Sequence, residues 1–238
     1  MVVLVTGGSR GIGERCVRDF CARGEQVYFF YHATGEARIA ALEGETGARG
    51  LRVDVADRAA VRAGIDRVIA EAGRLDVLVN NAGVAQIGLF TDMTEDEYTA
   101  LRGVNLDGAV FCAQRAAEQM VKQHSGRIVN IGSMWGKTGA SCEVAYSASK
   151  AGVRGLTMAL AKELGPSGIT VNCVEPGVID TDMNRLLDAD ARAALCDETP
   201  LCRLGTPADV SAAVLFFASA AAGFITGQIL GVDGGFAV

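Results

Sequence analysis

Short runs rich in β-branched residues alternate with longer, alanine-rich stretches from one end of the chain to the other. Several of the short runs are almost continuously apolar, which is typical of strands buried on both faces of a sheet. The predicted strands are Val2–Thr6, Gln26–Tyr31, Leu51–Val55, Val77–Asn80, Arg127–Ile131, Thr170–Val174 and Gln228–Val232. The predicted helices lie near residues 11–23, 34–46, 57–72, 94–123, 144–164 and 207–219.

Strand–helix alternation of this kind implies right-handed crossovers and a parallel sheet covered by helices on both faces. We therefore predict an α/β fold with a seven-stranded, doubly wound parallel sheet in a single domain spanning residues 1–238. No Pro/Ser-rich linker, charge block or internal repeat divides the chain. Residues 178–203 depart from the alternation and carry five aspartates, so we interpret them as an excursion over the sheet edge, with a mobile lid as one alternative.

Composition and charge exclude several classes of function. Half of the 238 residues are hydrophobic, and the net charge is −6, from 22 basic and 28 acidic residues. Because no run of Lys and Arg stands out, we expect neither nucleic acid nor a membrane as a partner. Seven cysteines without a C-x-x-C pair, and only two histidines, favour reduced thiols and give no reason to expect a metal site. The first residues lack the basic start of a signal peptide and the longest apolar stretch is too short to span a bilayer, so we expect a cytoplasmic protein.

A glycine-rich turn follows the first predicted strand and opens the first predicted helix. In VTGGSRGIG the spacing G-x-x-x-G-x-G places glycines at Gly7, Gly11 and Gly13. Unpaired N–H groups and the positive end of the helix dipole favour a phosphate there, and glycines let it approach the backbone. At the first strand–helix turn this pattern indicates a dinucleotide site, although a tight turn that binds nothing would use the same glycines.

This spacing resembles the turn of the short-chain dehydrogenase/reductases, a Rossmann-fold family, rather than the G-x-G-x-x-G of many other dehydrogenases. Three further stretches agree in order and spacing: RVDVAD (52–57), DVLVNNAG (76–83) and VNCVEPGVIDTDM (171–183). The resemblance implies that Asp54 contacts the adenine, that NNAG lies beside the riboses, and that the Pro-Gly segment with its threonine holds the carboxamide. The cofactor-binding residues that it implies are Gly7, Ser9, Arg10, Gly11, Ile12, Gly13, His32, Asp54, Val55, Asn81, Ala82, Gly83, Ile131, Tyr146, Lys150, Pro176, Gly177, Val178 and Thr181.

Tyr146 and Lys150, in AYSASKAG, share one face of a predicted helix among small side chains that leave room for a ligand. A free phenol has a pKa of about 10, and a lysine ammonium nearby is predicted to lower it. The tyrosine could then donate a proton to a carbonyl oxygen as hydride arrives, or accept one in the reverse direction. The alternative without catalysis is a buried tyrosine beside a lysine whose ammonium reaches solvent.

The family resemblance adds two residues to this pair. Ser133 ends the fifth predicted strand and could polarise the carbonyl oxygen by a hydrogen bond. Asn105 matches the family asparagine that bends a helix and holds a water linking the lysine to solvent. The implied catalytic set is Asn105, Ser133, Tyr146 and Lys150, which makes the chain an NADP-dependent short-chain oxidoreductase acting on CH–OH and C=O groups.

The end of the second predicted strand indicates NADP(H) rather than NAD(H). In NAD-dependent relatives this strand ends in an acid that binds the ribose 2′-hydroxyl and would repel a 2′-phosphate. Here the strand ends in Tyr31 and His32, and the first acid is Glu36. Arg10 lies in the glycine turn and could form a bidentate pair with the 2′-phosphate, with His32 as a second donor. The alternative is a surface arginine paired with a helix carboxylate.

The substrate is left open between two ketones. The segment 200–235, GRIVNIGS and ELGPSGITVN resemble the 3-oxoacyl-carrier-protein reductases, so the leading hypothesis is reduction of a 3-oxoacyl thioester. Against it, Ser167 stands where those enzymes commonly present a basic residue to an acidic carrier. The alternative comes from SMWGKTGASCEVAYS, which is similar to a branch that reduces a ketone on a modified lysine of elongation factor P. A second alternative is a nucleotide-sensing protein that has lost turnover.

Two acidic residues and one apolar segment complete the predictions. We interpret Glu143 and Glu175 as solvated carboxylates at the rim of the site, with attraction of a cationic substrate as the alternative. The family resemblance implies a homotetramer, in which the helices at 103–123 and 144–164 pair across one axis and the last helix and strand across another. AVLFFASAAAGFITG is consistent with it, because a monomer rarely exposes so apolar a surface.

Overall fold

The computed structural model describes residues 1–182 and 188–237. Its strands form one parallel sheet in the order β3-β2-β1-β4-β5-β6-β7. The strands are β1 (Val2–Thr6), β2 (Gln26–Tyr31), β3 (Arg49–Arg52), β4 (Val77–Asn80), β5 (Gly126–Ile131), β6 (Ile169–Pro176) and β7 (Ile229–Val232). The described helices are α1 (Gly11–Ala22), α2 (Glu36–Thr46), α3 (Arg58–Ala72), α4 (Glu95–Arg102), α5 (Gly108–Gln123), α6 (Trp135–Thr138), α7 (Val144–Leu164), α8 (Ala189–Glu198) and α9 (Pro207–Ala218).

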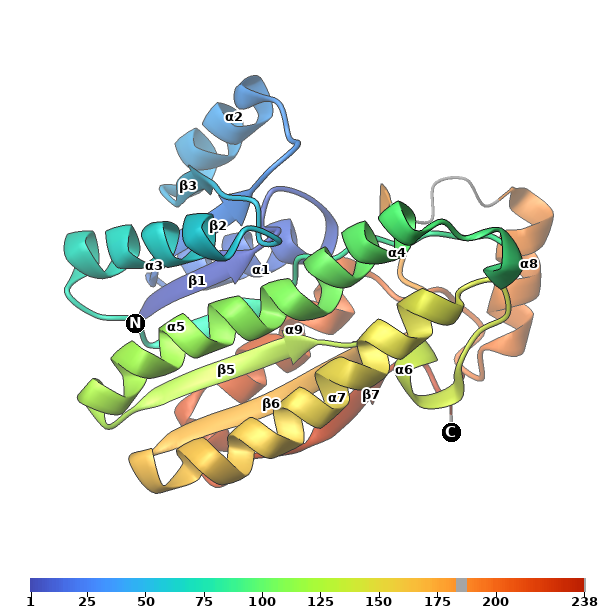
Figure 1. The fold of residues 1–238 in the computed structure, drawn as a ribbon. Coiled ribbons are helices and arrows are strands. Elements are labelled where there is room, and N and C mark those ends of the chain that lie inside the picture. The colour runs from blue at the N-terminus through green and yellow to red at the C-terminus, as the bar shows by residue number, and fades with distance from the viewer. Residues whose placement is uncertain (183–187, 238) are drawn as a thin grey trace.

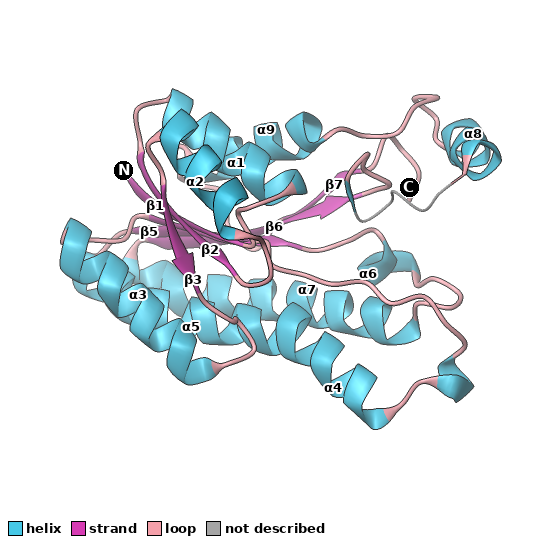
Figure 2. Ribbon diagram, turned by 90° about the horizontal axis from the view of Figure 1, so that it is seen from above, coloured by secondary structure: helices cyan, strands magenta, loops and turns pink. Residues whose placement is uncertain are grey.

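Helices cover both faces of the sheet, with α3, α5 and α7 on one side and α1, α2 and α9 on the other (Figure 1, Figure 2). Alternate residues of each strand enter opposite cores: Val3 and Val5 face the α1/α9 side, whereas Leu4 faces the α3/α5/α7 side. Both cores are mainly apolar where the strands cross them, as the continuous apolar runs predicted, and the buried Asn80, Asn130 and Thr157 hydrogen-bond to one another. The predicted α/β doubly wound fold is confirmed.

The strand order reverses between β1 and β4, and this places the ligand crevice at their carboxyl ends. The Thr6 hydroxyl, at the end of β1, accepts hydrogen bonds from the backbone N–H groups of Asn81 and Ala82, both at 3.0 Å. The two strand ends at the reversal are therefore tied together directly.

Two sequence predictions of element boundaries are wrong. The third strand is Arg49–Arg52 rather than Leu51–Val55, because Val53 and Val55 are buried beside the sheet while the chain already turns toward α3, whose N-cap is Asp57. The helix predicted over 94–123 is also not continuous. It consists of α4, a π-helical turn at Gly103–Asp107, and α5.

The segment 178–203 contains a helix that the sequence analysis missed. Asp188 caps α8 through the Ala191 N–H at 2.8 Å, and Arg192 of α8 pairs with Asp180 at 3.1 Å. Part of the segment, residues 183–187, lies outside the described residues. The excursion over the sheet edge and its role as a lid stay predictions.

Candidate active site

The glycine turn is packed too tightly for larger residues at two positions. A Cβ at Gly13 would lie 2.2 Å from the Gly7 carbonyl oxygen, and one at Gly7, where φ is +63°, would lie 2.9 Å from the Ala82 Cα. The Asn81 side-chain amide fixes this approach by donating to the Gly7 carbonyl at 3.1 Å. The glycine turn and the NNAG segment thus form one rigid unit.

A third segment, residues 176–181 at the end of β6, approaches the glycine turn at Gly11. A Cβ at Gly11, where φ is +55°, would lie 3.5 Å from the Thr181 methyl group. Gly177 is held against β7 by its N–H, which donates to the Val232 carbonyl at 3.0 Å. Thr181 therefore lies across from the start of α1, where the first N–H groups of the helix have no intrahelical partner, and Pro176, Gly177 and Val178 precede it in the same segment. This open cradle of backbone N–H groups between glycines fits the pyrophosphate of a nicotinamide dinucleotide.

Arg10 is the N-cap of α1 and its exposed guanidinium has no ion-pair partner in the described part of the chain. The nearby helix carboxylate, Glu14, instead pairs with Arg18 at 2.9 Å and with Arg38 at 2.8 Å. The alternative in which Arg10 pairs with a helix carboxylate is therefore not observed. Arg10 is available to an anion at the helix start.

Other polar groups near the end of β2 extend this region. The hydroxyls of Ser9 and Thr34 share a hydrogen bond of 2.7 Å, and Arg38 donates to the Ser9 carbonyl at 3.1 Å. His32 is exposed one residue beyond β2, and Asp54 accepts from the Ala56 N–H at 2.9 Å. Sequence reasoning missed Thr34 and Arg38. The available signal was the hydroxyl of Thr34, three residues beyond the second strand.

Lys150 projects from α7 into the junction between β4 and β5. Its side chain is 4% exposed, and its ammonium donates to the Ile131 carbonyl at the end of β5 at 2.9 Å. Nζ lies 5.7 Å from the centroid of the Tyr146 ring and 3.6 Å from the Cβ position of Gly83. Burial lowers the pKa of Lys150 to about 8, so the group is still mainly protonated at neutral pH.

The Tyr146 phenol differs from its sequence prediction. Its pKa is raised rather than lowered, because burial outweighs the hydrogen bond with Ser133 and the negative charge of Glu143 adds to the shift. The phenol is thus neutral at physiological pH and holds the proton that a reduction requires. Ser133 is buried at the end of β5, and its hydroxyl accepts from the Trp135 N–H at 3.2 Å.

Asn105 lies in the π-helical turn between α4 and α5. Its side-chain oxygen accepts from the Val84 N–H at 2.8 Å, and its side-chain nitrogen donates to the Val84 carbonyl at 2.9 Å and to the Ser149 hydroxyl at 3.3 Å. A π turn opens the helix backbone locally and occurs often at functional sites. The structure thus brings Asn105 against the strand end that also borders Lys150, while its role toward a water stays a prediction.

Glu175 is not a solvated rim carboxylate, and that prediction is wrong. The residue is 3% exposed, forms an ion pair with Arg154 of α7, and leaves Oε1 without a partner among the described residues. Burial raises the pKa of Glu175 against the opposing effect of Arg154. Oε1 lies 3.2 Å from the Cβ position of Gly132, the residue directly before Ser133. The pair therefore supports the wall of the site and does not face a substrate.

Glu143 is half-buried at the N-cap of α7, one helical turn from Tyr146. Its carboxylate has no hydrogen bond or ion pair within the residues described, and burial raises its pKa. A partly desolvated carboxylate without a partner among the described residues, next to Tyr146, is consistent with the cationic-substrate alternative for this residue.

Residues 1–182 and 188–237 contain neither a membrane-spanning helix nor a metal-binding group of side chains. Within these ranges no helix is both long and apolar enough to cross a membrane. In the same ranges no three His, Cys, Asp or Glu side chains are grouped to hold a metal ion.

The chain is similar to known proteins over nearly its whole length. A family model described as enoyl-(acyl carrier protein) reductase matches residues 7–237. The 3-oxoacyl-[acyl-carrier-protein] reductase FabG of Vibrio harveyi is 40% identical over 237 residues, covering 98% of this chain and 96% of the relative. The protein of the same name from Escherichia coli is 39% identical over 236 residues, again covering 98% and 96%. The structure of a mutant short-chain dehydrogenase/reductase from Serratia marcescens superposes with a TM-score of 0.92 at 33% identity, covering 100% of this chain and 98% of that chain.

Proposed function

Because the chain belongs to the short-chain dehydrogenase/reductase family and is an oxidoreductase acting on CH–OH or C=O groups, we propose that it is an NADPH-dependent reductase of 3-oxoacyl thioesters. The observation that carries the proposal is the placement of Tyr146 beside Ser133 and the buried Lys150 ammonium, whose Nζ lies 5.7 Å from the centroid of the Tyr146 ring. The names of the FabG relatives support the thioester as substrate.

In the proposed reaction the protein binds the carbonyl and supplies its proton. Ser133 and Tyr146 donate hydrogen bonds to the carbonyl oxygen, and Tyr146 transfers its proton to that oxygen as negative charge develops. Lys150 stabilises the phenolate that remains, because its ammonium is desolvated and held by the Ile131 carbonyl. The dinucleotide, when bound by the glycine turn and the segment 176–181, supplies the hydride from its nicotinamide.

NADPH is the proposed cofactor, and the proposed compartment is the cytoplasm. The support for NADPH is the unpaired Arg10 guanidinium beside Ser9, together with the absence of an acid from residues 31–35. A guanidinium there would bind a 2′-phosphate bidentately, whereas NADH offers it only hydroxyls.

A second substrate is favoured by Glu143. Its unpartnered, half-buried carboxylate lies beside Tyr146 and would pair with an amine close to the reacting ketone. The aminoketone carried on a modified lysine of elongation factor P has such an amine. The nucleotide-sensing alternative has no comparable support, because Tyr146 and Lys150 are both present and lie in one site.

NADPH oxidation against a substrate panel tests these proposals. The panel contains an acetoacetyl thioester, an enoyl thioester, simple ketones, diketones and elongation factor P carrying the aminoketone. Turnover of the acetoacetyl thioester and not of the modified factor supports the leading proposal, and the opposite pattern supports the second. Preference for the enoyl thioester would contradict both.

The proposed assembly is a homotetramer. Apolar side chains that remain exposed on α9 and around β7 support it, namely Phe216, Phe224 and Leu230. Light scattering at micromolar concentration tests it, and a monomeric mass would refute it.

A further inference from the structure

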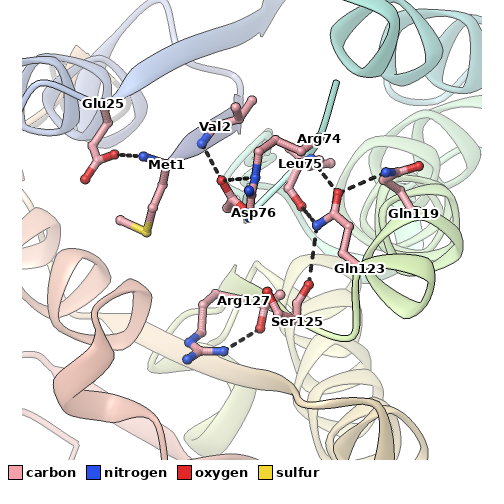
Figure 3. A network of polar contacts seen from close by, with 11 residues as sticks. Met1, Val2, Glu25, Arg74, Leu75, Asp76, Gln119, Gln123, Ser125 and Arg127 are labelled. Atoms are coloured by element: carbon pink, nitrogen blue, oxygen red, sulfur yellow. Dashed lines mark hydrogen bonds and ion pairs between the residues drawn. The ribbon is translucent and has the colours of Figure 1, made fainter. Parts of the chain in front are cut away.

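A pocket of about 580 Å³ opens at the amino ends of β1, β4 and β5, the edge of the sheet opposite the active site. Arg127, which lines it, precedes Ser133 by six residues along β5, about 20 Å in an extended strand. The pocket volume lies in the range of small-molecule sites. Figure 3 shows the polar network around it. The pocket is therefore separate from the dinucleotide cradle.

The described side chains that line the pocket are positively charged in sum. Arg74 and Arg127 contribute two positive charges and Asp76 one negative charge, giving a net charge of +1 on a chain whose net charge is −6. The Asp76 carboxylate is already satisfied: it accepts from the Val2 N–H at 2.7 Å and from Arg74 at 2.6 Å. Its charge is therefore compensated by Arg74, which leaves Arg127 as the uncompensated charge of the pocket.

Arg127 is the unsatisfied group of this pocket. Its Nη1 donates to the Gly126 carbonyl at 2.9 Å, and no carboxylate pairs with it within the part of the chain that the structure describes. The guanidinium is half-buried and is confined by the turn after α9, since its Nη2 lies 3.9 Å from the Cβ position of Gly223. Every other arginine in the described ranges either pairs with a carboxylate or is exposed to water.

A half-buried guanidinium whose remaining N–H groups have no partner among the described residues can donate to a ligand in the pocket. Its planar fork matches the oxygens of a phosphate or carboxylate group. Ser125 lines the same pocket, and its hydroxyl has no partner among the described residues. We propose that this pocket at the amino edge of the sheet binds a small oxyanion, with the Arg127 fork as its main contact and Ser125 and Arg74 as further donors.

Calorimetric titration with inorganic phosphate tests the proposal. The titration is run at constant ionic strength, against a chloride reference, with the dinucleotide site filled by NADP⁺ so that phosphate cannot bind at the glycine turn. We expect saturable binding to the wild type and binding at least about tenfold weaker to Arg127→Gln, which removes the charged fork. Arg62→Gln, which removes a guanidinium from exposed α3 outside the pocket, is the matched control and should bind as the wild type does.

Further arms identify the ligand and control for folding. Succinate replaces phosphate in a second titration, and tighter binding of either one supports the proposal and assigns the oxyanion. Arg127→Lys keeps the charge without the fork and should lose part of the affinity, which decides the matter if Arg127→Gln fails to fold. Equal affinity of wild type and both Arg127 variants, or no binding above the chloride reference, would overturn the proposal.

Discussion

Replacing Arg154 by methionine tests how the buried Glu175 carboxylate is stabilised. Methionine keeps most of the length of the arginine stem and removes its charge, so Glu175 would keep 3% exposure with neither oxygen paired. Removing one partner of a buried ion pair costs about 3–5 kcal/mol. Because the Arg154 side chain is 27% exposed and water screens part of the interaction, we expect the lower end, about 3 kcal/mol.

Reversible urea unfolding, followed by the fluorescence of the single tryptophan, measures this loss. In a chain of this length it corresponds to a fall in melting temperature of about 6–12 °C. The double variant Glu175→Leu/Arg154→Met removes both charges and should recover most of the lost stability. A double variant as unstable as the single one would refute the explanation, because packing and not the unpaired charge would then be the cause.

The pH dependence of Arg154→Met provides a second check. Burial already raises the pKa of Glu175 above the ordinary 4.5, and removing Arg154 removes the main opposing effect. An acid whose folded-state pKa is raised keeps its full contribution to stability below the unfolded pKa and loses it as pH rises through the folded pKa. The deficit of the variant should therefore be largest near neutral pH and shrink as pH falls toward 4.5. An equal deficit across this range would contradict the assignment.

Three further substitutions test the site. Tyr146→Phe should abolish turnover in the NADPH assay and leave dinucleotide affinity, measured by fluorescence titration, nearly unchanged; retention of more than about a tenth of the turnover would remove Tyr146 as the acid. Arg10→Ala should lower kcat/KM with NADPH at least about tenfold, or about 1.4 kcal/mol, and affect NADH much less, whereas equal losses would exclude a 2′-phosphate contact. Gly13→Ala should cost about 1–3 kcal/mol in urea unfolding, because its Cβ would lie 2.2 Å from the Gly7 carbonyl oxygen; a loss below about 0.5 kcal/mol would mean that the turn relaxes.

The strands were predictable where burial and pairing coincide. β1, β2 and β4 lie at their predicted bounds, because each is an apolar run that is both covered by helices and paired along its length. At β3 the two properties separate: Val53 and Val55 are buried, yet they lie beyond the paired residues. Hydrophobicity indicates burial and not strand pairing, so the predicted end of β3 lies beyond its observed end at Arg52.

The site was predictable as far as local motifs describe it. The glycine turn, NNAG and the Tyr–Lys pair are short motifs of nearly consecutive residues, although the contact between Asn81 and Gly7 joins two of these motifs across the chain. The Glu175–Arg154 pair and the contact of Ser9 with Thr34 join residues 21 and 25 positions apart, from different elements. The sign of the Tyr146 pKa shift was also out of reach, because it depends on how much protein surrounds the phenol.

The π-helical turn at Gly103–Asp107 interrupts a regular helix at the point where Asn105 contacts Val84. A π turn holds one residue more than an α-helical turn, so deleting a single residue there would let α4 and α5 continue as one regular helix. Because the π turn takes up the extra residue within about one turn, α4 and α5 would keep their orientation about the helix axis, and the change would be confined to the turn itself. The Asn105 amide would lose the backbone position from which it bonds Val84. A sequence optimised only for helix regularity would therefore lose the polar contacts that Asn105 makes beside Lys150.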